Sequence, residues 1–376
     1  MHVPAFTSGS RLLLFAPHPD DESLACSVLL QRAVRAGAAV RVVYVTDGDD
    51  NPWPQRVLER KWRLNATDRR RWGRLRQAEA LAALHVLGVN GSATRFLGLP
   101  DQKLTALLLG GCQSALARFA AIITDWRPTD LLVPSISDTH PDHSALAVML
   151  RLVQSESFSD LLARGQMAVW SYVVHGRSPT FFDRAETVCQ SHREAAVKLR
   201  AIWCHKTQLK LSRKRFLAYA GRPEHLVRLG ARDETIADGS IISAFRLPHS
   251  LRVELRLCPK AMRMAEPALF VLGRSEAGAL RCATMRVPAR SAGVEMLDSV
   301  SLDDVAVAQY CGNAFAGQIT IPVSIFSSAS TIFVKIERRS WFFDEAGWLE
   351  IPPAKSRTVP ELQRDGVEAG LVTIGT

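Results

Sequence analysis

Short apolar segments alternate with longer amphipathic segments through the first two thirds of the chain. Buried strands are predicted at residues 11–16, 40–46, 94–97, 130–134 and 167–174. Helical periodicity is found at residues 22–37, 74–88, 102–124, 143–155 and 190–204. This alternation predicts an α/β fold with a Rossmann-like, mainly parallel and doubly wound sheet.

The pattern changes after about Gly239. Segments such as SLRVELRL, ALFVLG, LRCATMRV, QITIPVSIF and TIFVKIERRSWFF are short and alternating or β-branched, and Pro, Gly and Ser separate them. They predict a smaller all-β, sandwich-like domain. We therefore expect two domains, residues 1–239 and 240–376, the second ending in a loosely held tail from Ala354.

The bulk composition restricts the class of protein and the chemistry that it can use. The first residues lack the pattern of a secretory signal, and no apolar run is long enough to span a bilayer, so a cytoplasmic protein is expected. Seven cysteines without a CxxC pair indicate neither a disulfide framework nor a thiolate metal site. Histidine and carboxylate remain as ligands for any metal, which suits zinc or a similar ion.

The end of the first predicted strand concentrates acidic side chains. APHPDDE at residues 16–22 places His18 just before Asp20, Asp21 and Glu22. Acidic residues can cap the helix that follows, but close carboxylates repel one another unless a cation is present. His18 and Asp21, three residues apart on a turn, can aim a nitrogen and an oxygen at one point.

A second cluster follows the strand at 130–134, where DTHPDH at residues 138–143 carries Asp138, His140, Asp142 and His143. Both clusters stand at strand ends, the edge at which α/β sheets place their sites. Two interpretations stay open on spacing alone: a divalent metal site, or solvated helix caps.

The formal net charge of +10 is concentrated between Arg56 and Arg76, and tryptophans are spaced through or beside that run. The run lies in a long insertion, residues 47–73, on the same edge as the two clusters. Two interpretations of this basic run stay open. It forms a solvated surface, or it attracts an anionic sugar conjugate or lipid headgroup. No nucleic-acid motif accompanies the run, so nucleic acid is not expected as a partner.

Several blocks resemble the PIG-L/LmbE-like N-acetylglucosaminyl deacetylases, a family of metal enzymes that remove N-acetyl groups from amino sugars. APHPDDE and DTHPDH resemble its two signature motifs. TDGD at 46–49, RQAEALAALHVLGV at 76–89, FLGLPD at 96–101 and KLRAIWCHKTQ at 198–208 resemble further blocks in the family's order. The resemblance covers about residues 10–235, and the predicted β domain lies outside it.

The resemblance implies a role for individual residues. His18, Asp21 and His143 would hold one divalent metal ion, which we expect to be zinc. Asp20 would be the general base and acid, and His140 would lie beside the oxyanion. The remaining implied roles are a sugar contact for Arg76 and Asp101, and orientation of a histidine for Asp142. His205 is as well explained by a core histidine as by a site residue.

The expected activity is metal-dependent hydrolysis of the N-acetyl group of an N-acetylhexosamine unit in a glycoconjugate. The substrate could be anionic or lipid-linked, with the protein in peripheral contact with the inner face of the membrane. Two alternatives stay open: a deacylase of an N-acylated small metabolite or antibiotic, and a non-catalytic glycan-binding protein that uses the β domain. The sequence leaves the oligomeric state open.

Overall fold

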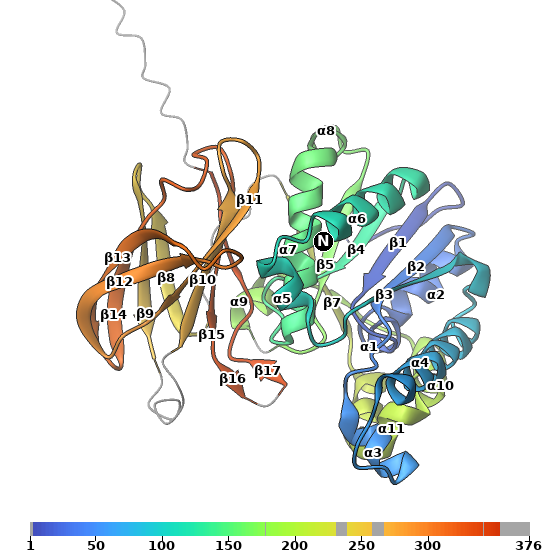
Figure 1. The fold of residues 1–376 in the computed structure, drawn as a ribbon. Helices are drawn as coiled ribbons and strands as arrows, with labels where there is room; N and C mark the ends of the chain where they lie inside the picture. Colours follow the sequence, from blue (N-terminus) through green and yellow to red (C-terminus); the bar gives the residue numbers. More distant parts are fainter. Residues whose placement is uncertain (1–2, 177, 231–238, 258–266, 341, 354–376) are drawn as a thin grey trace, which may run out of the picture.

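The computed structural model describes residues 3–176, 178–230, 239–257, 267–340 and 342–353. The N-terminal part is a mixed seven-stranded sheet with helices, and the C-terminal part is a separate antiparallel sheet (Figure 1). The tail expected from Ala354, and Cys258, lie outside the described residues. The other cysteines are free.

The first sheet has the order β3-β2-β1-β4-β5-β7-β6. Its parallel strands are β1 (Arg11–Ala16), β2 (Ala39–Thr46), β3 (Thr94–Leu99), β4 (Asp130–Pro134) and β5 (Ala168–Tyr172). Two antiparallel strands that the sequence analysis missed, β7 (Glu224–Leu229) and β6 (Glu186–Val188), complete one edge. The predicted strands are therefore confirmed to within a few residues at each end.

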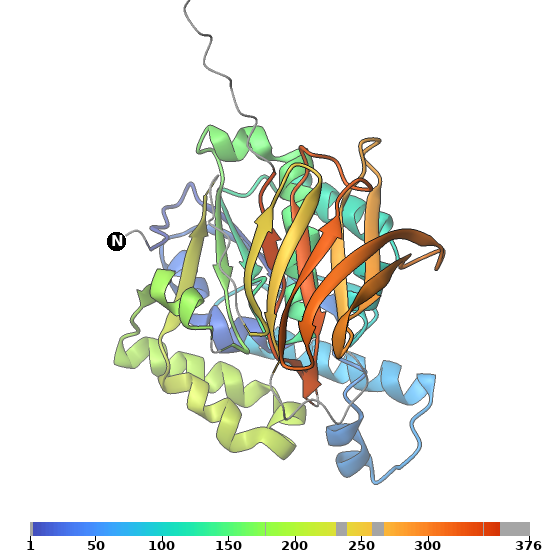
Figure 2. The same cartoon turned by 90° about the vertical axis from the view of Figure 1, so that its left-hand side faces the viewer.

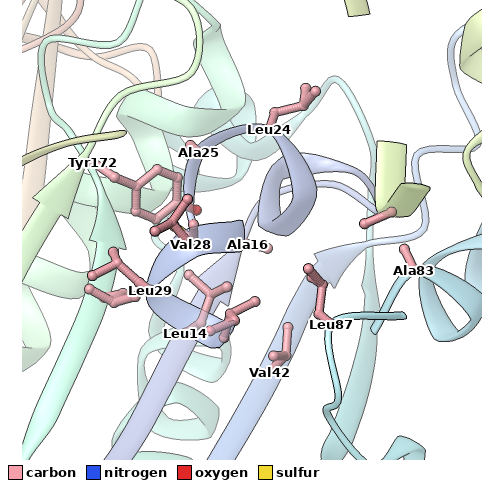
Figure 3. Packing of buried hydrophobic residues seen from close by; sticks show 14 of the residues in the cluster. Leu14, Ala16, Leu24, Ala25, Val28, Leu29, Val42, Ala83, Leu87 and Tyr172 are labelled. Carbon is pink, nitrogen blue, oxygen red and sulfur yellow. The ribbon is translucent and has the colours of Figure 1, made fainter. Parts of the chain in front are cut away.

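Alternate residues of β1 face two different hydrophobic clusters. Leu12 and Leu14 pack with α1 (Asp21–Ala25), α2 (Ser27–Arg35), α4 (Ala66–Val86) and α10 (His192–Cys204) (Figure 3). Leu13 and Phe15 pack with α5 (Leu104–Leu109), α6 (Gln113–Trp126) and α7 (Pro141–Ser157). Since side chains alternate along a strand, the residues of β1 after Arg11 are all buried because helices cover both faces of the sheet.

Two predicted helices are each divided in the structure. The helix expected at 22–37 breaks at Cys26, whose φ of −129° separates α1 from α2. The helix expected at 102–124 breaks at Gly110 and Gly111, the latter with φ of +83°. Periodicity alone cannot show such breaks, because the apolar spacing continues across them.

The insertion at 47–73 is largely helical and not a loop. It contains α3 (Pro52–Glu59) and the first turns of α4. Asn65 and Asp68 form a reciprocal capping box that begins α4 eight residues before the predicted start. The remaining helices are α8 (Ser159–Ala163), α9 (Pro179–Arg184) and α11 (Lys206–Ala218). None of the helices in the described part of the chain is long and apolar enough to cross a membrane.

The C-terminal strands form one nine-stranded antiparallel sheet, shown in front of the α/β part in Figure 2. Its strands are β8 (Ile241–Arg246), β9 (Ser250–Arg256), β10 (Ala268–Arg274), β11 (Leu280–Arg286), β12 (Arg290–Asp298), β13 (Asp304–Asn313), β14 (Ala316–Pro322), β15 (Ile332–Glu337) and β18 (Leu349–Ile351). The edge strands β8 and β18 contact each other, so the sheet is nearly barrel-like and not two stacked sheets. A sequence of alternating strands does not distinguish the two, since both bury one face of each strand.

The two parts share a hydrophobic cluster. Phe270 on β10 and Phe333 on β15 belong to the same cluster as the residues of α5, α6 and α7. Trp348, just before β18, is 3% exposed and joins them. An apolar interface of this kind favours a fixed arrangement of the two parts over free domain motion.

Candidate active site

The two predicted clusters meet at the carboxyl ends of β1 and β4. These strands are hydrogen-bonded neighbours in the sheet, so the turns that follow them lie side by side. The turn after β1 carries His18, Asp20 and Asp21, and the turn after β4 leads to His143 on α7. The chain direction of the sheet therefore brings together residues that are more than a hundred positions apart in the sequence.

Three donor atoms converge at this point. His18 Nδ1 lies 3.1 Å from His143 Nε2 and 3.5 Å from Asp21 Oδ2, and His143 Nε2 lies 3.4 Å from the same Asp21 oxygen. Ligand atoms about 2.0–2.1 Å from a tetrahedral ion are about 3.3–3.4 Å from one another. The donor spacing in the structure therefore fits one divalent metal ion.

The hydrogen bonding of the same residues also fits a cation. Asp21 Oδ1 is buried and accepts no hydrogen bond from the described residues. Three further groups whose donor atoms all lie within 4.8 Å of one another overlap the first, and they are His18–His140–His143, Asp21–His143–His175 and His18–Asp101–Asp142. A buried polar atom without a hydrogen-bond partner destabilises the fold, and a bound metal ion would provide the missing partner.

Carboxylates hold the far nitrogens of both imidazoles. Asp138 Oδ2 lies 3.1 Å from His143 Nδ1, and Asp142 Oδ2 lies 3.3 Å from His18 Nε2. Such contacts fix the tautomer and ring orientation of a metal-binding histidine. An orienting role for Asp142 stays a prediction, and the equivalent position of Asp138 was not predicted. Its place in DTHPDH was the only available signal.

Asp20 stands beside the cluster with a backbone φ of 155°, a conformation that residues other than glycine rarely adopt. Arg76 Nη2 donates to Asp20 Oδ2 at 3.0 Å and to the Pro19 carbonyl at 2.8 Å. Arg76 Nη1 donates to the carbonyl of Gly48, where a Cβ would lie 1.8 Å from that nitrogen. Arg76 thus fixes the Asp20 carboxylate from inside the protein.

His140 lies on the other side of the cluster, with ring centroids 4.8 Å from His18 and 4.9 Å from His143. Its Nδ1 accepts the backbone N–H of Asp142 at 3.3 Å. Burial lowers the pKa of His140 well below the usual value, and the charges of neighbouring imidazoles add to this effect. The ring is therefore neutral with its proton on Nε2, which leaves that nitrogen as a donor.

Charge and burial act in opposite directions on the remaining groups. Burial opposes the charged imidazoles of His18 and His143, but nearby carboxylates outweigh it and raise both pKa values. Burial also opposes ionisation of Asp21, and His143 and His18 outweigh it, so the pKa of Asp21 is lowered. At Asp20, burial dominates over Arg76 and raises the pKa to about 6. An acid poised near neutrality is what proton transfer requires.

The third acid of the first motif has a different partner. Glu22 Oε1 lies 2.9 Å from His205 Nε2 and accepts the Ser23 hydroxyl at 2.6 Å. Both Glu22 and His205 are buried. Glu22 therefore joins the first motif to the KLRAIWCHKTQ block, and His205 is a buried partner of that acid.

The two predicted sugar contacts lie at the site but are engaged by the protein. Arg76 is 4% exposed, and its hydrogen bonds go to the residues described above. Asp101 Oδ1 lies 3.2 Å from His18 Nε2, and its Oδ2 accepts the Asp50 amide at 2.7 Å. A contact of either residue with a sugar hydroxyl stays a prediction.

Three residues that the sequence analysis did not place in the site border it. His175, after β5, has its ring centroid 5.1 Å from that of His143. Arg215 on α11 donates to His175 Nδ1 at 3.0 Å. Phe343 of the C-terminal part contacts the rings of His140 and His175. Nothing local in the sequence connects Arg215 or Phe343 with the two motifs.

The basic insertion begins at the site and continues away from it. The Asp50 amide contacts Asp101, and Arg69 forms an ion pair with Asp50. Arg71 pairs with Glu59 and Asp68. Part of the positive charge of the run is therefore neutralised within the insertion itself.

A buried cluster of His and Asp at the carboxyl edge of an α/β sheet is typical of hydrolases that activate water with a divalent metal. Residues 13–153 match the sequence model of a family described as PIG-L: GlcNAc-PI de-N-acetylase. Residues 13–153 thus carry a match to the PIG-L family, and the recognition made from the motifs is confirmed.

The names of similar proteins point to the same family. The 1D-myo-inositol 2-acetamido-2-deoxy-alpha-D-glucopyranoside deacetylase of Mycobacterium avium is 33% identical over 146 residues, which are 35% of this chain and 47% of the relative. The protein of the same name from Mycobacterium sp. strain KMS is 28% identical over 239 residues, 54% of this chain and 75% of the relative. In the first of these comparisons, the matched segment spans about half the length of the relative.

Solved structures include N,N'-diacetylchitobiose deacetylase from Pyrococcus horikoshii, with a TM-score of 0.45 and 16% identity. That match covers 58% of this chain and 84% of the other.

Proposed function

We propose that this protein is a metal-dependent deacetylase that hydrolyses the N-acetyl group of an N-acetylhexosamine unit in a glycoconjugate. The observation that carries the proposal is the convergence of His18 Nδ1, Asp21 Oδ2 and His143 Nε2 within 3.5 Å of one another beside Asp20. The names of the family and of its relatives support the amino-sugar amide as the bond that is broken.

The position of the cluster in the fold also supports the proposal. In a Rossmann-like, doubly wound sheet, ligands bind at the carboxyl ends of the strands where the strand order reverses. We take the parallel strands to form such a sheet, and the order β3-β2-β1-β4-β5 reverses between β1 and β4. Those are the two strands whose ends carry the cluster.

The residues that would hold the metal are His18, Asp21 and His143, and zinc suits their nitrogen and oxygen donors. A divalent ion bound there supplies an acidified water and polarises the amide carbonyl. Asp138 and Asp142 hold the two imidazoles in place through their second nitrogens. At this part of the site, the two carboxylates therefore serve to orient the metal-binding imidazoles.

The protein also supplies the groups that move protons. In the proposed reaction, Asp20 takes a proton from the attacking water and returns it to the departing amine. Arg76 holds its carboxylate through a hydrogen bond of 3.0 Å. His140, neutral and with a proton on Nε2, can donate to the oxyanion, an interaction worth about 3–4 kcal/mol in comparable sites. Arg76 and Asp101 remain our candidates for contacts with the sugar hydroxyls.

Amine release from a panel of acetylated compounds tests the proposal. The panel contains N-acetylglucosamine free, linked to inositol, nucleotide-linked and lipid-linked, together with N-acylated antibiotics. We expect zinc-dependent release from at least one N-acetylglucosamine conjugate, lost on chelation and restored by the metal. Release from N-acylated antibiotics alone would favour the alternative deacylase, and glycan binding without release would favour the non-catalytic alternative.

We further propose that the substrate is anionic or lipid-linked and that the protein acts in the cytoplasm with α3 at the inner face of the membrane. Trp53 and Trp62 are 42% and 76% exposed, next to the exposed Arg60 and Arg63. Exposed tryptophans beside basic residues favour an anionic membrane surface.

Salt dependence tests this second proposal. Attraction between exposed charges is screened within about 10 Å at 0.1 M salt, so kcat/KM for an anionic conjugate should fall as salt rises. Replacement of Arg60, Arg63 and Arg74 by Ser should flatten that dependence and leave a neutral N-acetyl sugar unaffected. Equal effects on both substrates, or no binding to anionic vesicles by the parent, would refute the proposal.

A further inference from the structure

The C-terminal part of the molecule reaches the candidate site through one short segment. After β15, the strands β16 (Arg339–Ser340) and β17 (Phe343–Asp344) form a small hairpin outside the large sheet. In Figure 1 this hairpin lies at the end of β15, on the side of the α/β part. It belongs to a region beyond the residues matched by the family, 13–153.

Backbone hydrogen bonds attach this segment to the second motif. The Asp344 amide donates to the carbonyl of Thr139 at 2.8 Å, and the Trp348 amide donates to the carbonyl of Ile136 at 2.7 Å. Thr139 directly precedes His140. The hairpin is therefore fixed to the loop that carries the candidate oxyanion donor.

A buried charge strengthens the attachment. The Lys335 ammonium on β15 is 2.5 Å from Asp344 Oδ2 and donates to the Ser144 hydroxyl on α7 at 3.3 Å. Lys335 and Asp344 are both almost fully buried, with side chains 1% exposed. Loss of one partner would leave the other charge buried and unpaired, which destabilises a protein strongly. The contact therefore keeps the hairpin in place.

Gly347 permits the close approach of the two parts. A Cβ at this position would lie 1.8 Å from the carbonyl oxygen of Ile136. The neighbouring atoms are backbone and cannot rotate away, so any larger residue would push the hairpin off the loop. This position offers a way to alter the docking without touching the cluster.

Phe343 is the side chain that this attachment delivers to the site. Its ring centroid lies 5.8 Å from that of His140 at an interplanar angle of 79°, and 5.2 Å from that of His175. Arg215 covers the Phe343 ring with its guanidinium carbon 5.1 Å from the centroid. His140 is thus enclosed by the cluster on one side and by Phe343 on another.

Hydrogen bonds alone hold His140 weakly. Its Nδ1 accepts the Asp142 amide at 3.3 Å, longer than the usual distance of about 2.9–3.0 Å. The Gln102 amide nitrogen lies 3.4 Å from its Nε2, and because both nitrogens are donors they form no hydrogen bond. Packing against neighbouring rings must therefore decide the orientation of the imidazole.

We infer that the C-terminal β domain completes the candidate active site, and that Phe343 is a positioning residue that orients the His140 imidazole. This inference rests on the proposed function, in which His140 donates to the oxyanion. Removal of the Phe343 ring would let His140 turn, and misplacement of a donor costs turnover more than substrate binding.

Two independent changes test the inference, Phe343→Ala and Gly347→Ala. With zinc bound, each should lower kcat about 10- to 100-fold with little change in KM. Phe343→Leu, which refills part of the space, should recover part of the loss. Phe315→Ala serves as the matched control, because Phe315 is 48% exposed on the same domain and lies outside the site. Zinc content and thermal unfolding show whether each variant is loaded and folded.

The imidazole resonances of His140, assigned by their loss in His140→Gln, give a second measurement that needs no substrate. We expect them to shift in Phe343→Ala and in Gly347→Ala and to stay in place in Phe315→Ala. Parental kcat in both test variants, or a lowered kcat with unshifted His140 resonances, overturns the inference. If no acetylated compound is hydrolysed by the parent, the proposed function fails, and the resonances alone still decide whether Phe343 positions His140.

Discussion

The α/β part of the molecule buries two groups of charged side chains that differ in how completely their charges are matched. Lys198 on α10 contacts Glu224 on β7 at 3.1 Å, and both side chains are fully buried. Glu224 also accepts the amides of Val28 and Leu29 at 2.9 and 3.2 Å. The cluster of His18, Asp21 and His143 is also buried, yet its donor atoms converge on one point and Asp21 Oδ1 has no hydrogen-bond partner among the described residues.

The fully paired group stabilises the fold, whereas the incompletely paired group is available to bind a ligand. A buried ion pair whose remaining atoms are all satisfied joins secondary-structure elements, here α2, α10 and β7. A buried cluster whose donor atoms converge on one point, with a carboxylate oxygen left unsatisfied, is stabilised by a bound cation. The incomplete group is therefore the one that we assign to function.

The largest expected effect is the loss of metal from His143→Ala. This change removes one of the three converging donors, so the protein should bind far less zinc and lose nearly all deacetylase activity. Elemental analysis of the purified variant measures this directly. Since a metal that binds only the folded state stabilises it, added zinc should raise the Tm of the parent but not that of the variant.

The control for this prediction is His85→Ala, because His85 is exposed on α4 and remote from the cluster. It should retain metal and activity. A full equivalent of tightly bound zinc in His143→Ala would show that the ligand set is wrong.

Next in size is the effect of Asp20→Asn on turnover. Asn cannot take a proton from water, so kcat should fall by about 10²–10⁴ while zinc content stays at the parental value. Steady-state kinetics with the zinc-loaded variant provide the measurement. The exposed Asp125, paired with Arg41, supplies a matched control as Asp125→Asn. Parental kcat in Asp20→Asn would assign the proton transfer to another group.

Lys198→Met tests the fully paired group, the ion pair of Lys198 and Glu224. It leaves the Glu224 charge buried without its cation, so the free energy of unfolding should fall by about 3–5 kcal/mol. Denaturant unfolding measures the loss, and the zinc content of the folded protein should not change. The exposed Lys210 on α11 provides the control as Lys210→Met.

A second change makes the cause specific. Glu224→Gln in the Lys198→Met background removes the unpaired charge and keeps an acceptor for the α2 amides, so it should restore part of the lost stability. If it lowers stability further, the cost lies in packing and not in charge.

The smallest expected effect concerns a half-exposed pair, Arg32 with Glu194. The hydrogen bond from Arg32 at 3.0 Å lowers the pKa of Glu194 from 4.5 to about 2. Because the folded-state pKa is lowered, ionised Glu194 stabilises the fold above pH 4.5, and this contribution is lost as the pH falls toward 2. Arg32 is one third exposed, so solvent screening reduces the contribution to about 1 kcal/mol.

Glu194→Gln should therefore lower the free energy of unfolding by about that amount at pH 7, and the difference from the parent should shrink below pH 4.5. Unfolding by denaturant at several pH values between 7 and 3 measures it. Asp160→Asn on α8 is the exposed control. A difference that persists unchanged at low pH would mean that the ion pair does not contribute.

The sequence by itself determined the parallel strands and the two motifs at their ends. The strands β1 and β4 agree with their predicted bounds because apolar composition and a polar break are both local properties. The motifs followed for the same reason, since three or five residues on one turn bring His18 near Asp21 and Asp138 near His143. The PIG-L family could thus be recognised from short segments.

Only the tertiary structure decided how the three acids of the first motif are divided. Asp20 pairs with Arg76, Asp21 lies beside the two imidazoles, and Glu22 contacts His205. Their partners lie on α4, on α7 and at the end of α10, and no local pattern selects among them. The same holds for Phe343, two hundred positions beyond His140. Its place beside the site depends on how a second sheet packs against α5–α7, a long-range contact that the periodicity of a sequence does not encode.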